Sequence, residues 1–178
     1  MFESVGFRLF NLAGVEGPDT HFVHFRIIES TSETGTNQYS TDFQGPYLAV
    51  EQLDGDFLDA HDLPDGNLYK MERNSGPNRI GGESNNQGRS SVTDYSDLVS
   101  FKTTYENSDP SEAWWRANFN LASYYGYRSI VEGIHHGDIG YGKNYFYYHN
   151  PITQLWQTIP WELDLTWANN MYGNGNEP

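Results

Sequence analysis

Two carboxylates near the end of the chain have the residue types and spacing of a metal site. Glu162 and Asp164 are separated by one residue within the stretch IPWELDLTW, where most of the other side chains are apolar. An unpaired charge buried among such neighbours would cost several kcal/mol. We therefore expect a compensating partner for the pair, and a divalent cation would serve as one.

A glycine-rich segment upstream supplies two further oxygen ligands. Asp138 and Asn144 lie in HHGDIGYGKN, directly before the aromatic stretch KNYFYYHNPITQLWQTIPW. That stretch predicts two strands joined by a turn at Asn150-Pro151, and such a hairpin would bring Asp138 and Asn144 to the same edge of the fold as the carboxylate pair. Carboxylate and carboxamide oxygens are the ligands that Mg²⁺ and Mn²⁺ prefer, often together with substrate phosphates.

The order of these residues is also that of a phosphotransfer site. In such a site a loop aspartate orients a hydroxyl nucleophile, an asparagine about six residues later binds metal, and a hairpin leads to a second metal-binding carboxylate. Asp138, Asn144 and Asp164 occur in this order. Residue type alone leaves a structural alternative open, in which Asp138 and Asn144 form turns and Asp164 caps a following helix.

Composition and charge exclude several classes of function. The chain has 178 residues, which is enough for one domain with a core, and its 13 Tyr, 10 Phe and 5 Trp favour a folded body. Its formal net charge of −14 argues against nucleic-acid binding and favours cations or basic partners. The absence of cysteine excludes disulfides and thiolate sites. We expect no membrane span and no signal peptide, because no apolar run approaches roughly 20 residues and MFESVGFRLF lacks the required pattern.

The elements that must position the candidate residues are a mixture of helices and strands, as in an α+β fold. The pattern predicts a first helix ending near Gly14, paired strands in THFVHFRIIE and GPYLAVEQLD, a short helix around DFLDAHDL and a strand in DGNLYKM. Residues 74–90 are rich in Gly, Asn and Ser and predict an exposed loop. From Asp94 onward the pattern is helical, and Ser111 is an N-cap candidate for one long helix or two.

Four of these segments, taken in order, resemble the spore-coat CotH kinase family. GPYLAVEQLD, DGNLYK, GDIGYGKNYFYYHNP and LWQTIPWELDLTW are similar to the family patterns GxYxLVEQVD, GNLYK, D…NYYLYH(D/N)P and W…IPWDLDLTF. The opening FRLFNLAGV…THFVHFRI resembles the family segment before them, so the resemblance covers most of residues 1–172. It implies an atypical protein-kinase-like fold, with residues 1–178 as a single domain that is truncated at both ends and has an incomplete N-terminal lobe.

The same resemblance implies an activity and a set of site residues. Members phosphorylate Ser or Thr of secreted or spore-coat proteins with ATP and Mg²⁺ or Mn²⁺, which implies a location outside the cell, at its surface or in the coat. The matching positions are Asp138 as the catalytic aspartate, Asn144, Glu162 and Asp164 as metal ligands, and Glu51 and Lys70 near the nucleotide.

Two other functions stay open at this point. Glu162 stands where the family pattern has aspartate, and its extra methylene displaces the carboxylate by about 1 Å, which favours a catalytically impaired pseudokinase or a structural coat or scaffold module. The acidic, Tyr- and Trp-rich composition suggests instead an extracellular carbohydrate-active protein that uses carboxylates as acid and base. Trp114 and Trp115 could form its sugar platform, although helical Trp pairs more often anchor a core.

Three further side chains have structural alternatives to a functional role. Lys70 could reach phosphates, but a strand lysine is more often a solvated residue at a sheet edge. His135 and His136 invite a metal-site interpretation. Without another histidine at ligand spacing, a turn or the C-terminal end of a helix fits them better.

Overall fold

The computed structural model describes residues 2–27, 43–72, 85–86 and 95–167, and these residues form helices and strands in mixed order. The elements are α1 (Phe2–Leu12), β1 (Thr20–Arg26), β2 (Phe43–Val50), α2 (Gly55–Ala60), β3 (Asn67–Met71), β4 (Asn85–Asn86), α3 (Ser96–Asn107), α4 (Glu112–Asn118), α5 (Leu121–Gly133), the 3-10 helix η1 (Gly137–Gly142), β5 (Tyr145–His149) and β6 (Trp156–Pro160). This mixture confirms the predicted α+β class.

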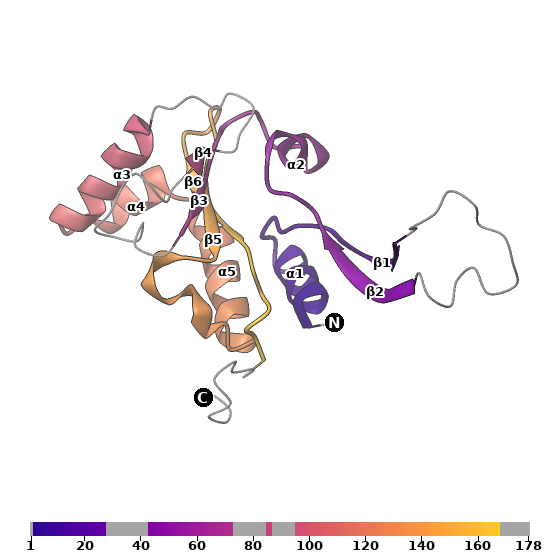
Figure 1. The fold of residues 1–178 in the computed structure, drawn as a ribbon. Helices are drawn as coiled ribbons and strands as arrows, with labels where there is room; N and C mark the ends of the chain where they lie inside the picture. Colours follow the sequence, from indigo (N-terminus) through magenta and orange to yellow (C-terminus); the bar gives the residue numbers. More distant parts are fainter. Residues whose placement is uncertain (1, 28–42, 73–84, 87–94, 168–178) are drawn as a thin grey trace, which may run out of the picture.

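The described strands form two sheets of different character. β1 and β2 pair as an antiparallel ribbon that projects from the body, while the second sheet has the order β4-β3-β5-β6 (Figure 1). The predicted loop of residues 74–90 lies mostly outside the described residues, but part of that prediction is wrong. Asn85 and Asn86 form β4 by pairing with Lys70 and Tyr69, a strand that polar composition alone conceals.

The predicted aromatic hairpin is confirmed and sets the geometry at the end of the sheet. β5 and β6 are antiparallel, and Tyr145 at the start of β5 pairs with Pro160 at the end of β6. The chain enters β5 directly after Asn144 and leaves β6 toward Glu162, so the hairpin returns the acidic segment to the place where the glycine-rich loop ends. This is the arrangement that the sequence predicts.

Helices cover both faces of the four-stranded sheet. α3 and α4 lie on one side and α2 on the other (Figure 1), while α1 packs against α5. On the α3 side, the ring of Phe101 stacks on Trp156 at 4.8 Å and on Trp114 at 5.9 Å, so Trp114 packs in the core as the structural alternative predicts. Among the described residues, no helix is both long and apolar enough to cross a membrane.

The long helical region is divided into two helices, α4 and α5, at Phe119 and Asn120. Phe119 is extended and forms a parallel bridge to Trp156. The backbone N–H of Asn120 donates to the carbonyl of Trp156 at 2.8 Å, and its side-chain oxygen caps α5 by accepting from the N–H of Ser123 at 3.2 Å. Ser111 caps α4 as predicted, because its hydroxyl accepts from the N–H of Trp114.

A single carboxylate joins α3 to the sheet. Asp97 accepts hydrogen bonds from the side chains of Asn67, Tyr69 and His149, which lie on β3 and β5, and from the backbone N–H of Leu98. Burial acts to raise the pKa of Asp97, but these hydrogen bonds outweigh it and lower the pKa from 3.8 to about 2. The ionised carboxylate is therefore a strong structural contact.

Replacing Asp97 by asparagine should destabilise the fold and remove an acid-sensitive contribution. Because the folded-state pKa of Asp97 is depressed, its contribution is fully present above pH 3.8 and is lost as the pH falls through about 2. We expect Asp97→Asn to lower the free energy of unfolding at pH 7 by about 2 kcal/mol, measured by urea unfolding at pH 7 and pH 2.5. The exposed Asp109→Asn is the control, and an equal loss in that variant would contradict the assignment.

Candidate functional site

The glycine-rich loop brings Asp138 and Asn144 into direct contact. The loop forms η1, and the Asn144 carboxamide nitrogen donates to Asp138 Oδ2 at 2.8 Å and to the Asp138 carbonyl at 3.2 Å. Asn144 is buried, and its φ of 63° lies in the left-handed region, which Asn tolerates better than most residues. Because the amide nitrogen is used in these bonds, the carboxamide oxygen is left to accept a cation.

Lys143 places a positive charge on the same aspartate. Its ammonium lies 2.8 Å from Asp138 Oδ1 and 2.9 Å from Oδ2, and both side chains are about three-quarters buried. Lys143 was not among the residues predicted from the sequence. Its position next to the metal-ligand candidate Asn144 was a signal that could have identified it. A cation held here can neutralise the charge of a phosphoryl group that approaches Asp138.

His136 lies beneath this pair, at the point where α5 leads into η1. It is 2% exposed, and within the described part of the chain neither of its ring nitrogens has a hydrogen-bond partner. Burial lowers the pKa of His136 to about 4, while Asp138 and Asp164 both act to raise it. The imidazole is therefore neutral at pH 7. Both carboxylates are therefore within electrostatic range of the ring.

The carboxylate pair does not share the burial of its neighbours. Glu162 and Asp164 are exposed, whereas Leu163 between them is fully buried. The expectation that both charges are buried is therefore wrong. The alternation along the segment directs the leucine into the core and leaves the two acidic groups facing solvent.

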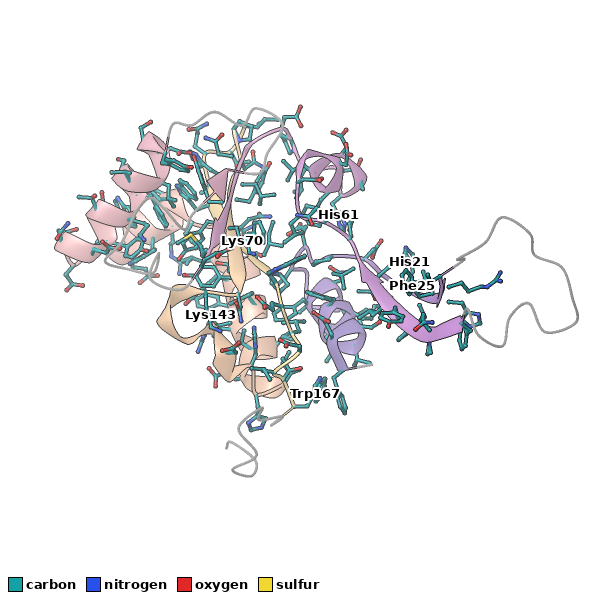
Figure 2. All side chains as sticks on the ribbon, in the orientation of Figure 1. His21, Phe25, His61, Lys70, Lys143 and Trp167 are labelled. Carbon is teal, nitrogen blue, oxygen red and sulfur yellow. The ribbon has the colours of Figure 1, made fainter. Side chains whose placement is uncertain are left out.

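Contacts on both sides of Asp164 fix the acidic segment to the body. Leu163 packs against α1 at Gly6, where an added Cβ would lie 2.8 Å from a leucine methyl carbon. The backbone N–H of Leu163 donates to Glu3 Oε1 at 3.3 Å, and that of Trp167 donates to the carbonyl of Ile134 at 2.5 Å. The second bond ties the segment to the end of α5, close to His136. Figure 2 shows Trp167 on this lower part of the molecule, with Lys143 higher and to its left.

Glu3 adds a third carboxylate that sequence reasoning missed. Burial raises its pKa, and the nearby Asp164 and Glu162 raise it further, while the hydrogen bond from Leu163 acts in the opposite direction. Glu3 lies 160 residues from Leu163, so no local motif could associate them. Carboxylate oxygens are the hard ligands that Mg²⁺ and Mn²⁺ prefer, so the donor chemistry of these residues suits either ion. Their ligand atoms are not gathered within 4.8 Å of one another, as those of Asp19, Glu51 and His61 are among the described residues.

Lys70 is inside the sheet rather than at its edge. β3 is flanked by β4 and β5, so the edge position in the structural alternative is wrong, although the side chain remains partly exposed. Lys70 pairs in register with Phe146, two residues after Asn144, and its ammonium forms a 2.8 Å ion pair with Glu72. Figure 2 shows Lys70 on β3. The register thus brings the strand that carries Lys70 to the start of β5, where the loop ends.

Glu51 belongs to a different group of side chains. Its Oε2 accepts from the backbone N–H of Asp19 at 2.9 Å and lies 2.8 Å from Nε2 of His61, which Figure 2 places beside α2. The ligand atoms of these three residues lie within 4.8 Å of one another. Among the described residues, no hydrogen bond joins Glu51 to Asp138 or Asn144.

Replacing Glu3 by glutamine tests whether the three carboxylates form a cation site. We expect Glu3→Gln to raise the thermal midpoint without metal, because repulsion from Glu162 and Asp164 is removed, and to reduce the further rise that Mg²⁺ produces. Differential scanning fluorimetry with and without Mg²⁺ measures both effects, with Asp109→Asn as the control. A lower metal-free midpoint together with an unchanged response to Mg²⁺ would contradict the site.

Comparison with known proteins gives one result. The chain matches the family described as CotH kinase protein over residues 1–178, which is its full length. None of the curated proteins matches it. The match agrees with the four ordered motifs, and two of those motifs contain the contacting Asp138 and Asn144 and the acidic segment. The chain therefore belongs to the CotH kinase family, whose members are kinase-like.

Proposed function

We propose that the chain is a protein kinase that transfers the γ-phosphoryl group of ATP, bound with Mg²⁺ or Mn²⁺, to a Ser or Thr hydroxyl of a secreted or spore-coat protein. The observation that carries the proposal is the hydrogen bond between Asp138 and Asn144 directly before β5, together with the β5–β6 hairpin, which returns the chain to Glu162 and Asp164 at the same end of the sheet. Membership of a kinase family supports phosphotransfer as the reaction class.

Asp138 is the proposed residue that positions the acceptor. Its carboxylate would receive a hydrogen bond from the acceptor hydroxyl and take that proton as the oxygen attacks the γ-phosphorus and the bond to the ADP oxygen breaks. The hydrogen bond from Asn144 fixes the orientation of the carboxylate. The protein contributes position and charge, and no covalent intermediate with a side chain is required.

The proposed cation ligands are the carboxamide oxygen of Asn144 and the carboxylates of Asp164 and Glu162. When bound, the cation would neutralise charge on the phosphate oxygens. Asp164 is anchored on both sides through Leu163 and Trp167, whereas Glu162 has a left-handed φ of 56°. Glutamate is less suited to that backbone conformation than aspartate. We therefore assign the principal ligand role to Asp164.

Lys143 is the proposed neutralising group for the transferred phosphoryl. Its ammonium is shared between both oxygens of Asp138. A γ-phosphoryl group beside Asp138 would attract the same ammonium, so Lys143 can contact the phosphate while it stays close to the carboxylate. Lys70 remains a proposed nucleotide contact because β3 runs beside the start of β5. Glu51 contacts Asp19 and His61, so a role of Glu51 near the nucleotide would involve these two residues as well.

A scaffold without turnover is the alternative function. The exposed Glu162, in place of the aspartate of the family pattern and in a left-handed conformation, favours it. The scaffold would keep the fold and the contact between Asp138 and Asn144 but transfer no phosphate. Nucleotide binding and turnover must therefore be measured separately.

Two aspartate variants separate binding from turnover. We expect Asp138→Asn to keep the thermal stabilisation by Mg-ATP but to lose about 100-fold or more in phosphotransfer, because the proton acceptor is removed. Asp164→Ala should lose both. At 100 times its dissociation constant a ligand adds about 2.7 kcal/mol of stability, which calorimetry resolves. If Mg-ATP does not stabilise the folded wild-type chain, the kinase proposal fails, and stabilisation without turnover supports the scaffold.

Removing the charge of Lys143 should slow the chemical step. We expect Lys143→Met to reduce kcat by about 100-fold, with a smaller change in KM for ATP, because the charge matters most as the phosphoryl group is transferred. Lys143→Arg, which keeps the charge, should recover part of the rate. Steady-state kinetics with radiolabelled ATP gives both constants. A Lys143→Met variant with wild-type kcat would show that the ion pair is only structural.

A further inference from the structure

A cavity of about 550 Å³ lies among α3, α4, α5 and β5, and it shares no residue with the proposed kinase site. Seven of the nine side chains that line it are aromatic, and the other two are Leu121 and Glu112. The volume lies within the usual range for small-ligand pockets. Tyr125, one of the lining residues, is 61% exposed.

The aromatic walls meet nearly at right angles. The rings of Trp115 and Phe101 are inclined at 88°, and those of Tyr124 and Phe119 at 83°. Tyr147 is inclined at 85° to Phe119. A flat ligand can stack on only one such wall at a time, whereas a compact group meets several rings at once. The geometry thus favours a rounded ligand over a planar one.

The charge at the cavity favours a cation. Glu112 is the charged lining residue, and its ion pair with Arg116 uses Oε1 at 2.6 Å, so that Oε2 lies outside the pair. Burial raises the pKa of Tyr105 and Tyr147, so these hydroxyls stay neutral. The negative faces of aromatic rings attract cations, most strongly where water is excluded. The net charge of −14 adds a long-range attraction.

The floor of the cavity is already formed by the core. Phe101 lines the cavity and stacks on Trp156, with the two ring centroids 4.8 Å apart. Phe119 is held in place by its backbone bridge to Trp156. A preformed pocket avoids the cost of ordering side chains when a ligand binds.

We propose that this cavity binds an organic cation, namely an ammonium or methylated ammonium group, whether on a small molecule or on a side chain. Trp115, Tyr124 and Tyr147 provide the ring contacts, and Glu112 lies at the rim. The proposal rests on the cavity alone and does not depend on the kinase activity.

Choline and its uncharged carbon analogue 3,3-dimethylbutan-1-ol test the role of charge. The two have the same shape, so a pocket that is only apolar would bind both equally. We expect choline to bind about 10-fold more tightly, measured by isothermal titration calorimetry on the full chain. Equal affinity, or no binding of either, would overturn the proposal. Nα-acetyl-lysine methylamide, titrated in the same way, tests whether the ammonium group belongs to a protein side chain or to a small molecule. Tighter binding than choline would assign the site to a side chain, and weaker binding would assign it to a small ligand.

Two matched carboxylate variants locate the binding. Glu112 on α4 and Glu132 on α5 are both exposed. Glu112 forms an ion pair with Arg116, four residues later, and Glu132 forms one with Arg128, four residues earlier. Glu112→Gln should weaken choline binding severalfold without changing the affinity of the alcohol, and Glu132→Gln should change neither. Trp115→Leu should abolish choline binding. Wild-type affinity in both Glu112→Gln and Trp115→Leu would overturn the assignment of this cavity.

Discussion

The burial of Leu163 between α1 and α5 determines where the charged groups of the site lie. Because this side chain is fully enclosed, its neighbours Glu162 and Asp164 must face outward, and its backbone N–H reaches Glu3 on α1. The absence of a side chain at Gly6 leaves room for this contact. One apolar contact therefore fixes two exposed carboxylates beside a third, which electrostatics alone would oppose.

Asp97 and Glu3 are carboxylates in opposite electrostatic environments. Asp97 is surrounded by donors, which lower its pKa to about 2, and it joins α3 to the sheet. Glu3 receives one hydrogen bond, and burial and two like charges raise its pKa. The first arrangement stabilises the fold, whereas the second costs free energy. Unfavourable local interactions of that kind are typical of binding sites, where a ligand supplies the missing partner.

The parts of the fold that could be predicted from the sequence are those governed by local rules. The β5–β6 hairpin follows from two arms rich in aromatic and β-branched residues around a turn, and the contact of Asp138 with Asn144 joins residues only six apart. Glu3 could not be predicted, because its relation to Asp164 depends on the tertiary packing of Leu163. β4 was missed because two asparagines carry no strand propensity and pair only where β3 offers an edge.

β5 connects the two proposed sites. Asn144 precedes the strand at the proposed kinase site, and Tyr147, three residues later, lines the aromatic cavity on the side of α3. A change at Tyr147 would alter the packing of β5 and could displace Asn144 as well, so its effects could not be assigned to one site. Trp115 and Glu112 belong to α4, outside that strand. Substitutions there change the cavity while leaving the residues around Asp138 in place, and that separation makes the two proposals independently testable.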